Sequence, residues 1–205
     1  MSAAEDEEGA AVLLEEDDDG VAVLRLNRPA ERNPLSVSTL ERLDSLFSSL
    51  AARGSVRAVV FTGADDAFAS GADIREVGAL APETAREFAA RGQRLFQSIA
   101  EARQLTVAAV NGFCMGGGLD LALACRLRVA APAATFAHPG ARLGIITGWG
   151  GTQRLPRLVS GGLAFEMLLT GRRLSGAEAL AAGLVHQLSE DPVARARELA
   201  LAARP

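Results

Sequence analysis

Apolar positions near the N-terminus follow a pattern that is typical of a β-hairpin. The segment "AAVLLEEDDDGVAVLRLNRP" (residues 10–29) holds two apolar runs separated by an acidic stretch that ends in Asp19-Gly20. An Asp-Gly pair between apolar runs is a strong hairpin signal, because these residues adopt the backbone angles of a tight turn at low cost. We therefore predict two antiparallel strands joined by a solvated acidic turn rather than a metal site.

Two later segments change to helical spacing. Residues 36–52 are predicted to form a helix that begins at a capping serine, Ser36 or Ser38. Its apolar residues would share one face: Leu40, Leu43, Phe47 and Leu50. A long helix is predicted after Pro82, and its inner face would be formed by Phe88, Leu95, Phe96 and Ile99.

Short apolar runs between and after these helices predict buried strands at residues 56–63, 106–110, 126–131 and 135–138. Strands that alternate with helices indicate an α/β domain with largely parallel strands. No internal repeat or low-complexity linker interrupts the pattern. We expect one domain over residues 1–205, in which residues 1–9 form a disordered acidic N-terminus.

Composition and charge exclude several classes of function. The net charge is −4 and the arginines are scattered, which argues against a nucleic-acid-binding surface. No apolar run approaches the ~20 residues that a membrane span requires. The acidic first residues lack the basic region of a secretory or transit signal, so a cytoplasmic location is predicted.

The 21 basic residues are all arginine, and the absence of lysine is informative. It excludes the Walker A phosphate loop, Schiff-base enzymes and Ser-x-x-Lys nucleophiles, since each requires a lysine amine. Cys114 and Cys125, the only cysteines, lack the spacing of a zinc or redox site. We predict that both are buried as small apolar residues.

Three glycines join a predicted strand to a predicted helix in "VNGFCMGGGLDLALAC" (residues 110–125). The first N–H groups of a helix have no intrahelical partner, and glycine lets a ligand approach them closely. This stretch therefore suits the binding of an anion or oxyanion. It does not match the dinucleotide motif G-x-G-x-x-G, because Leu121 stands at the position of the last glycine.

A second helix entrance is predicted in "FASGADIRE" (residues 68–76), after a tight turn at Gly71. Asp73 and Glu76 have capping-box spacing, and Asp73 is predicted to cap the helix. The N–H group of Ala72 would lie at this entrance. Two backbone donors that converge on one point form an oxyanion hole, in which each donor typically contributes ~10²–10³ in rate.

Four blocks, in this order, carry a resemblance to a known family: "FASGADIRE", "AAVNGFCMGGGLDLALACRLRVAAPAATFAHP", "GWGGTQRLPRLV" and "EMLLTGRRLSGAEALAAGLV". The chain resembles the crotonase (enoyl-CoA hydratase/isomerase) family from about the first hairpin to its end. The resemblance implies an α/β spiral of repeated ββα units that binds an acyl-CoA and stabilises the enolate of its thioester. No metal and no separate cofactor are expected, since coenzyme A is part of the substrate.

The resemblance also implies roles for individual residues. The oxyanion donors would be the backbone N–H groups of Ala72 and Gly117. Ser70, Ala72 and Ile74 match the strip that holds the adenine and pantetheine of coenzyme A. Arg28, Arg32 and Arg75 are the arginines best placed to meet its phosphates; the alternative is that they form a solvated face. The full acyl-CoA-binding set would be Arg28, Arg32, Ser70, Ala72, Asp73, Ile74, Arg75, Gly116, Gly117, Gly140 and Trp149.

The catalytic positions depart from the family pattern. Enoyl-CoA hydratases use two glutamates: one activates water for attack at the β-carbon, and the other delivers a proton to the α-carbon. The first matches Asp120, whose side chain is shorter by one methylene, and the second matches Gly140 in "HPGARLG". A missing acid–base group typically costs ~10²–10⁴ in rate. His138 is the candidate substitute, because residues two apart on a strand face the same way; the alternative is a hydrogen-bonded imidazole near a strand end.

Two further features bear on the pocket and the assembly. Trp149 stands where the family usually has a small residue, and it is expected either to narrow the acyl pocket or to pack in the core. His186 lies away from the motifs and is predicted to be structural. The chain ends at "RELALAARP", where family members continue into helices that close the acyl pocket and pack subunits into trimers. We therefore expect truncated C-terminal helices, and a homotrimer or dimer of trimers where those helices are present.

Reversible hydration of a 2-enoyl-CoA to a 3-hydroxyacyl-CoA is the leading prediction. A double-bond isomerase or a decarboxylase with the same oxyanion hole is the nearest enzymatic alternative. A catalytically silent acyl-CoA-binding protein is the alternative outside enzymology, and Gly140 motivates it. A serine hydrolase is disfavoured, because the chain has no G-x-S-x-G motif.

Overall fold

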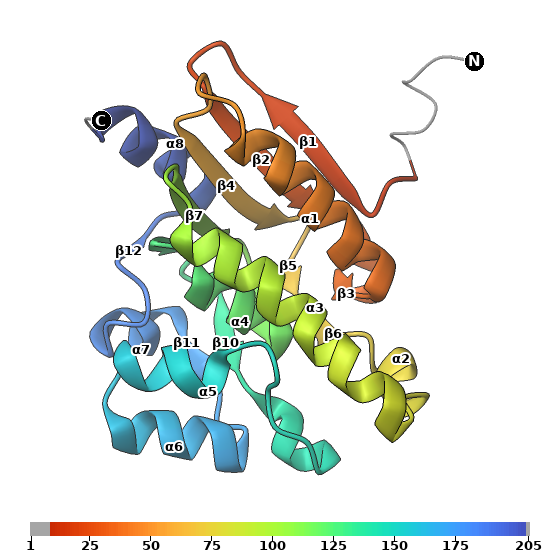
Figure 1. The fold of residues 1–205 in the computed structure, drawn as a ribbon. Helices are drawn as coiled ribbons and strands as arrows, with labels where there is room; N and C mark the ends of the chain where they lie inside the picture. The colour runs from red at the N-terminus through yellow and green to blue at the C-terminus, as the bar shows by residue number, and fades with distance from the viewer. Residues whose placement is uncertain (1–8, 204–205) are drawn as a thin grey trace.

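The computed structural model describes residues 9–203 (Figure 1). Residues 1–8 of the predicted disordered N-terminus lie outside the described residues, and Gly9, its last residue, lies in a turn. None of the helices within residues 9–203 has the length and apolar content that a membrane span requires.

The larger sheet has six strands in the order β1-β2-β4-β7-β9-β12. Their bounds are Val12–Glu16 (β1), Val21–Leu26 (β2), Ala58–Gly63 (β4), Leu105–Val110 (β7), Leu127–Ala130 (β9) and Gln187–Leu188 (β12). β1 and β2 pair antiparallel, with Val12 opposite Leu26, which confirms the predicted hairpin. The remaining neighbours in this sheet pair parallel.

A second sheet has the order β11-β10-β8-β5, and β3 pairs with β6 in a separate ribbon. The bounds are Pro34–Leu35 (β3), Ala67–Ala69 (β5), Gly71–Ala72 (β6), Phe113–Met115 (β8), Thr135–Ala137 (β10) and Leu174–Ser175 (β11). Along the chain, β4, β7 and β9 each join the larger sheet, and the strands that follow them, β5, β8 and β10, join the second sheet. The chain therefore winds as the predicted spiral of ββα units.

Helices fill the turns of this spiral. The α-helices are α1 (Val37–Ala51), α2 (Ile74–Gly78), α3 (Pro82–Glu101), α4 (Gly117–Ala124), α5 (Gly151–Arg154), α6 (Gly161–Thr170), α7 (Gly176–Ala181) and α8 (Pro192–Ala202). Three short 3₁₀ helices are η1 (Pro29–Glu31), η2 (Pro139–Leu143) and η3 (Leu155–Arg157). The predicted serine cap of the first helix is confirmed, since Ser36 Oγ accepts the N–H of Thr39 at 3.2 Å.

The larger sheet is buried on both faces, because alternate residues of each strand point to opposite sides. Val21 and Val23 of β2 pack with Ala196 and Ala200 of α8 on one face. On the other face, the even-numbered residues of β2 pack with α1 and α3, which cross in front of the sheet in Figure 1. Burial on both faces explains why the central strands are almost wholly apolar.

The C-terminal end of α4 is held by a buried cation. Arg128 is 2 % exposed, and it donates to the carbonyl oxygens of Cys125 (2.6 Å) and Leu184 (2.7 Å). Its backbone N–H donates to Nδ1 of His186 at 3.2 Å, so His186 has the structural contact that its sequence position predicted. Cys125 is buried, as Cys114 is, and burial raises the pKa of its thiol to about 12. These contacts fix the helix whose first turn enters the site.

Candidate active site

Two glycine-containing backbones meet where β6 approaches the first turn of α4. Gly71 has φ +103° and Gly116 has φ +51°, and both conformations favour glycine. A Cβ on Gly71 would lie 2.9 Å from the Met115 carbonyl oxygen and 3.0 Å from the Gly117 nitrogen. A Cβ on Gly117 would lie 3.4 Å from the Ala72 nitrogen. The two backbone nitrogens predicted to form the oxyanion hole are therefore close neighbours.

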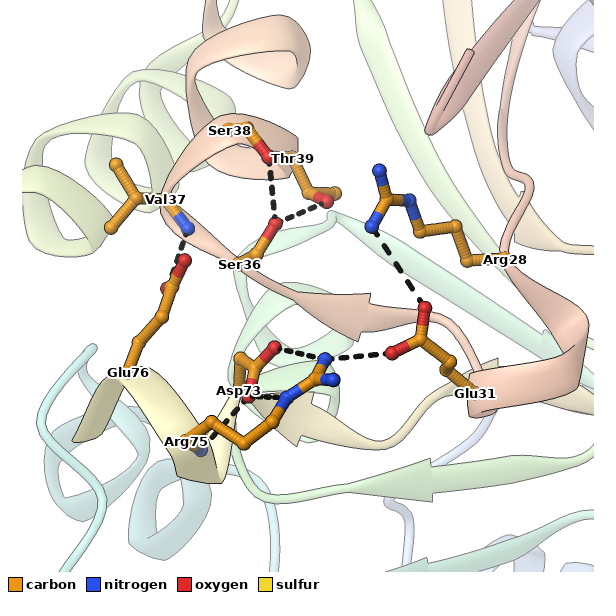
Figure 2. A network of polar contacts seen from close by, with 9 residues as sticks. All are labelled: Arg28, Glu31, Ser36, Val37, Ser38, Thr39, Asp73, Arg75 and Glu76. Carbon is orange, nitrogen blue, oxygen red and sulfur yellow. Dashed lines mark hydrogen bonds and ion pairs between the residues drawn. The ribbon is translucent and has the colours of Figure 1, made fainter. Parts of the chain in front are cut away.

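Asp73 caps α2, as predicted from its spacing. Its Oδ1 accepts the backbone N–H of Arg75 at 2.9 Å, and its side chain is buried. Glu76 does not close a capping box with Asp73; instead, its Oε2 accepts the backbone N–H of Val37 at 2.8 Å. Figure 2 shows how this contact joins the start of α2 to the start of α1. The short helix that follows Ala72 is thus tied to a long neighbouring helix.

A chain of ion pairs surrounds this cap (Figure 2). Arg75 contacts Asp73 and Glu31, both at 2.7 Å, and Glu31 also contacts Arg28 at 3.9 Å. The hydrogen bonds from Arg75 are the largest cause that lowers the pKa of Asp73, to about 2. Any phosphate that binds Arg28 or Arg75 must therefore compete with Glu31.

Arg32 has a different environment from the other two arginines predicted to meet coenzyme A. Its guanidinium lies 4.9 Å from the ring centroid of Phe113, and its carbonyl oxygen accepts the N–H of Ser70 at 2.9 Å. Its φ of +61° places the backbone in the left-handed region. Arg32 therefore supports the strip that begins at Ser70 through its backbone.

A cavity of about 280 Å³ lies beside the two glycine segments. Most of the predicted site residues line it: Ser70, Ala72, Ile74, Gly116, Gly117, Asp120, His138, Gly140 and Trp149. A second cavity, of about 320 Å³, shares Ser70, Ala72 and Ile74 with the first and adds Asp73 and Arg75. Arg28 and Arg32 line neither cavity. The structure thus brings together most of the residues implied by the family resemblance, on one continuous surface.

Asp120 lies in the first turn of α4 and is fully buried. Its Oδ2 accepts the hydroxyl of Thr147, while Oδ1 meets no hydrogen-bond donor in the described part of the chain. Burial raises the pKa of Asp120 to about 6; the bond from Thr147 and the nearby amides of Trp149 and Gly151 oppose part of that rise. At neutral pH the cavity therefore holds an ionised carboxylate that accepts protons readily.

His138 lies opposite that carboxylate, at the end of β10. Its Nε2 is 3.5 Å from Asp120 Oδ1, and neither ring nitrogen has a hydrogen-bond partner among residues 9–203. The residue is 2 % exposed, and burial lowers the pKa of His138 to about 4. Burial therefore favours the neutral imidazole at neutral pH.

Gly140 leaves no space for a second carboxylate in the present backbone. A Cβ at this position would lie 2.8 Å from the Ile145 carbonyl oxygen. The Gly140 carbonyl accepts the N–H of Ile145 at 3.0 Å, which closes a turn at the edge of the cavity. A larger residue at position 140 would have to displace this turn.

Trp149 packs in the core, which is one of the two predicted alternatives, and it also lines the cavity. Its ring stacks edge-on against Phe96, with ring centroids 5.8 Å apart, and it lies at a tilt to Phe88 at 5.4 Å. A Cβ on Gly92 or on Gly117 would lie 2.5 or 2.4 Å from ring atoms of Trp149. The ring therefore forms a wall directly beside one predicted oxyanion donor.

Thr147 and Gly151 are site residues that sequence reasoning missed. A Cβ on Gly151 would lie 2.1 Å from Asp120 Oδ1 and 2.9 Å from His138 Cε1, so only glycine leaves room for this pair. The block "GWGGTQRLPRLV" contains Gly151 and begins just after Thr147. A lone threonine and a loop glycine carry no chemical signature by themselves, and only the fold places them beside Asp120.

A spiral of ββα units with a glycine-rich entrance to α4 defines the α/β crotonase fold. A family model described as enoyl-CoA hydratase/isomerase matches residues 16–204, and the chain belongs to that family. It is 41% identical over 169 residues to the crotonyl-CoA hydratase of Syntrophomonas wolfei, covering 82% of this chain and 65% of the relative. It is 39% identical to the short-chain-enoyl-CoA hydratase of Clostridium acetobutylicum, covering 83% of this chain and 66% of the relative.

A solved structure supports the same assignment. The enoyl-CoA hydratase from Bacillus anthracis superposes with a TM-score of 0.88 at 35% identity, over 93% of this chain and 75% of that one. The chain spans about two thirds of the length of the two curated relatives above.

Proposed function

We propose that this chain catalyses the reversible addition of water to a 2-enoyl-CoA. The observation that carries the proposal is the first turn of α4, which brings the Gly117 backbone and the Asp120 carboxylate to one apolar cavity beside Ala72. The thioester oxygen would lie between the N–H groups of Ala72 and Gly117. Asp120 would then face the reacting carbons from the same helix turn.

One carboxylate balances the protons of the whole reaction. Asp120 removes a proton from water as the water oxygen bonds to the β-carbon, and the electrons of the double bond move towards the thioester oxygen. The two backbone donors stabilise this charge more in the transition state than in the ground state. Asp120 then returns its proton to the α-carbon, which completes the hydration and leaves the carboxylate ionised.

The surroundings of Asp120 favour this role. A base works best when its pKa lies near the working pH, and burial raises the pKa of Asp120 to about 6. Asp120 and His138 are the ionisable side chains that line the cavity. His138 is neutral at pH 7 and can hold the reacting water through Nε2, 3.5 Å from Asp120 Oδ1.

The decisive experiment measures loss of the conjugated thioester absorbance of crotonyl-CoA. The Asp120→Asn variant is expected to lose at least ~10² of the rate, because it removes the acid–base group. Asp44→Asn, an exposed change on α1, is the matched control and keeps the wild-type rate. Equal rates for Asp120→Asn and wild type would remove Asp120 from the mechanism.

A double-bond isomerase is a second candidate, and Gly140 favours it. Moving a double bond requires one base, which takes a proton from the α-carbon of a 3-enoyl-CoA and returns it to the γ-carbon. The cavity offers one carboxylate for this, since Gly140 supplies none. Conversion of 3-hexenoyl-CoA without net uptake of water identifies the isomerase.

A catalytically silent acyl-CoA-binding protein is distinguished by the same assays. It would bind an acyl-CoA in calorimetry and turn over neither substrate. The homotrimer or dimer of trimers that the family resemblance implies is tested by sedimentation of the purified chain with and without acyl-CoA.

A further inference from the structure

The two oxygens of the Asp120 carboxylate have different surroundings. Oδ2 accepts a hydrogen bond from Thr147 Oγ1, while Oδ1 is buried, has no hydrogen-bond donor among residues 9–203 and lies 3.5 Å from His138 Nε2. A free carboxylate can rotate and exchange its oxygens. The Thr147 donor on Oδ2 opposes that exchange and leaves Oδ1 facing His138.

Thr147 reaches Asp120 from a distant part of the chain. It lies in the loop between η2 and α5, twenty-seven residues after Asp120, and it lines the same cavity. The ideal Cβ of Gly151 would lie 2.7 Å from Thr147 Cγ2, so the methyl group of Thr147 packs against the start of α5. Packing on one side and the carboxylate on the other fix the direction of the hydroxyl.

The bond has one chemical direction when Asp120 is ionised. A carboxylate only accepts hydrogen bonds, so the threonine hydroxyl must donate. The neutral imidazole of His138 lies beside Oδ1, the other oxygen of the carboxylate, and makes no hydrogen bond to it. Thr147 is thus the side chain whose donor holds the carboxylate in the described part of the site.

We propose that Thr147 is the positioning residue of Asp120, and that its hydroxyl holds Oδ2 so that Oδ1 transfers the protons. This inference rests on the proposed acid–base role of Asp120. Thr147 acts through the carboxylate and does not itself exchange protons with the substrate. The same bond stabilises the ionised form of Asp120 and thereby opposes the rise in its pKa.

The test measures the pH dependence of crotonyl-CoA hydration for Thr147→Val, which keeps the side-chain shape and removes the hydroxyl. The midpoint of the acid limb is expected to move upwards by about one pH unit or more, since a hydrogen bond to a charged group is lost. We expect kcat at pH 7 to fall at least ~10-fold, with a smaller change in KM. A carbon-13 NMR titration of the Asp120 carboxyl carbon should show the same upward shift without substrate.

Matched variants separate the possible outcomes. Thr147→Ser keeps the hydroxyl and should give the wild-type midpoint of the acid limb. Thr147→Ala also removes the hydroxyl, with a smaller side chain, and should show the same upward shift where Thr147→Val does not fold. Thr135→Val is the control, because the buried Thr135 hydroxyl has no hydrogen-bond partner in the part of the chain that the structure describes. A wild-type midpoint in Thr147→Val or Thr147→Ala overturns the inference. An active Asp120→Asn variant overturns the proposed function instead.

Discussion

Replacing Trp149 by alanine is expected to lengthen the acyl chain that the site accepts. Trp149 is 3 % exposed and lies against Phe88 and Phe96, with one edge against Gly117. Because the ring also lines the cavity beside the proposed oxyanion donors, its removal joins new apolar space to the existing 280 Å³. The same change removes a large part of the local core.

Two magnitudes follow from this position. Truncating a buried tryptophan to alanine lowers the free energy of unfolding by ~3–5 kcal/mol. Each additional methylene buried in the enlarged pocket contributes ~0.8 kcal/mol, which is about fourfold in kcat/KM. The ratio of kcat/KM for 2-hexenoyl-CoA to that for crotonyl-CoA should therefore rise by up to about 15-fold, because the two substrates differ by two methylenes.

Hydration rates for crotonyl-CoA, 2-hexenoyl-CoA and 2-octenoyl-CoA provide the assay, with urea unfolding measured in parallel. Trp149→Phe keeps most of the wall and should shift the ratio little. Leu95→Ala is the matched control, because Leu95 is a buried residue of α3 outside the cavity lining. If Trp149→Ala and Leu95→Ala lose similar stability and both keep the wild-type substrate ratio, Trp149 is only a core residue and the reasoning is refuted.

Three further changes test the site. Asp120→Asn should raise the free energy of unfolding by up to ~3 kcal/mol at pH 7 and by little near pH 4. The folded-state pKa of Asp120, about 6, lies above the usual 3.8, so its ionisation costs stability only as the pH rises. Urea unfolding of both proteins across this range checks the prediction, and a stability difference that does not change with pH contradicts it. Gly117→Ala should lower the free energy of unfolding by ~1–3 kcal/mol and the hydration rate by at least ~10²-fold, because its Cβ would lie 2.4 Å from the Trp149 ring. Unchanged kinetics would show that the Gly117 N–H group is not an oxyanion donor. Gly140→Glu should lower the hydration rate rather than restore a second acid, because its Cβ would lie 2.8 Å from the Ile145 carbonyl oxygen; a faster enzyme would contradict this.

The fold could be predicted from the sequence wherever a local pattern determines it. The Asp19-Gly20 turn, the serine cap at Ser36 and the apolar face of residues 82–101 are each decided by neighbouring residues. The structure confirms all three. Local physics also predicted the helix start at Asp73, because a capping aspartate acts on the next turn of its own chain.

The candidate site was predictable only in part. Glycines at a helix entrance indicate a backbone that a ligand can approach, and the family resemblance singles out Gly117 among them. The donor to Asp120 could not be predicted, because the contact from Thr147 depends on a loop that the fold returns to α4. The partner of Glu76 was missed for the same reason: its spacing indicates a capping box, but the tertiary fold brings the Val37 N–H group closer.

The position of Asp120 explains how a site with one carboxylate could still complete an acyl-CoA reaction. Gly117 and Asp120 share the first turn of α4, so helix geometry fixes the spacing between the proposed oxyanion donor and the proposed base, and the Thr147 hydroxyl holds the carboxylate itself. Burial then moves two pKa values in opposite directions, upwards for Asp120 and downwards for His138, which leaves one negative charge in the cavity at pH 7. A second buried carboxylate would add a like charge and raise the pKa of its neighbour further. Because Gly140 adds no second carboxylate, Asp120, whose pKa stays near neutral pH, can both accept the proton and return it.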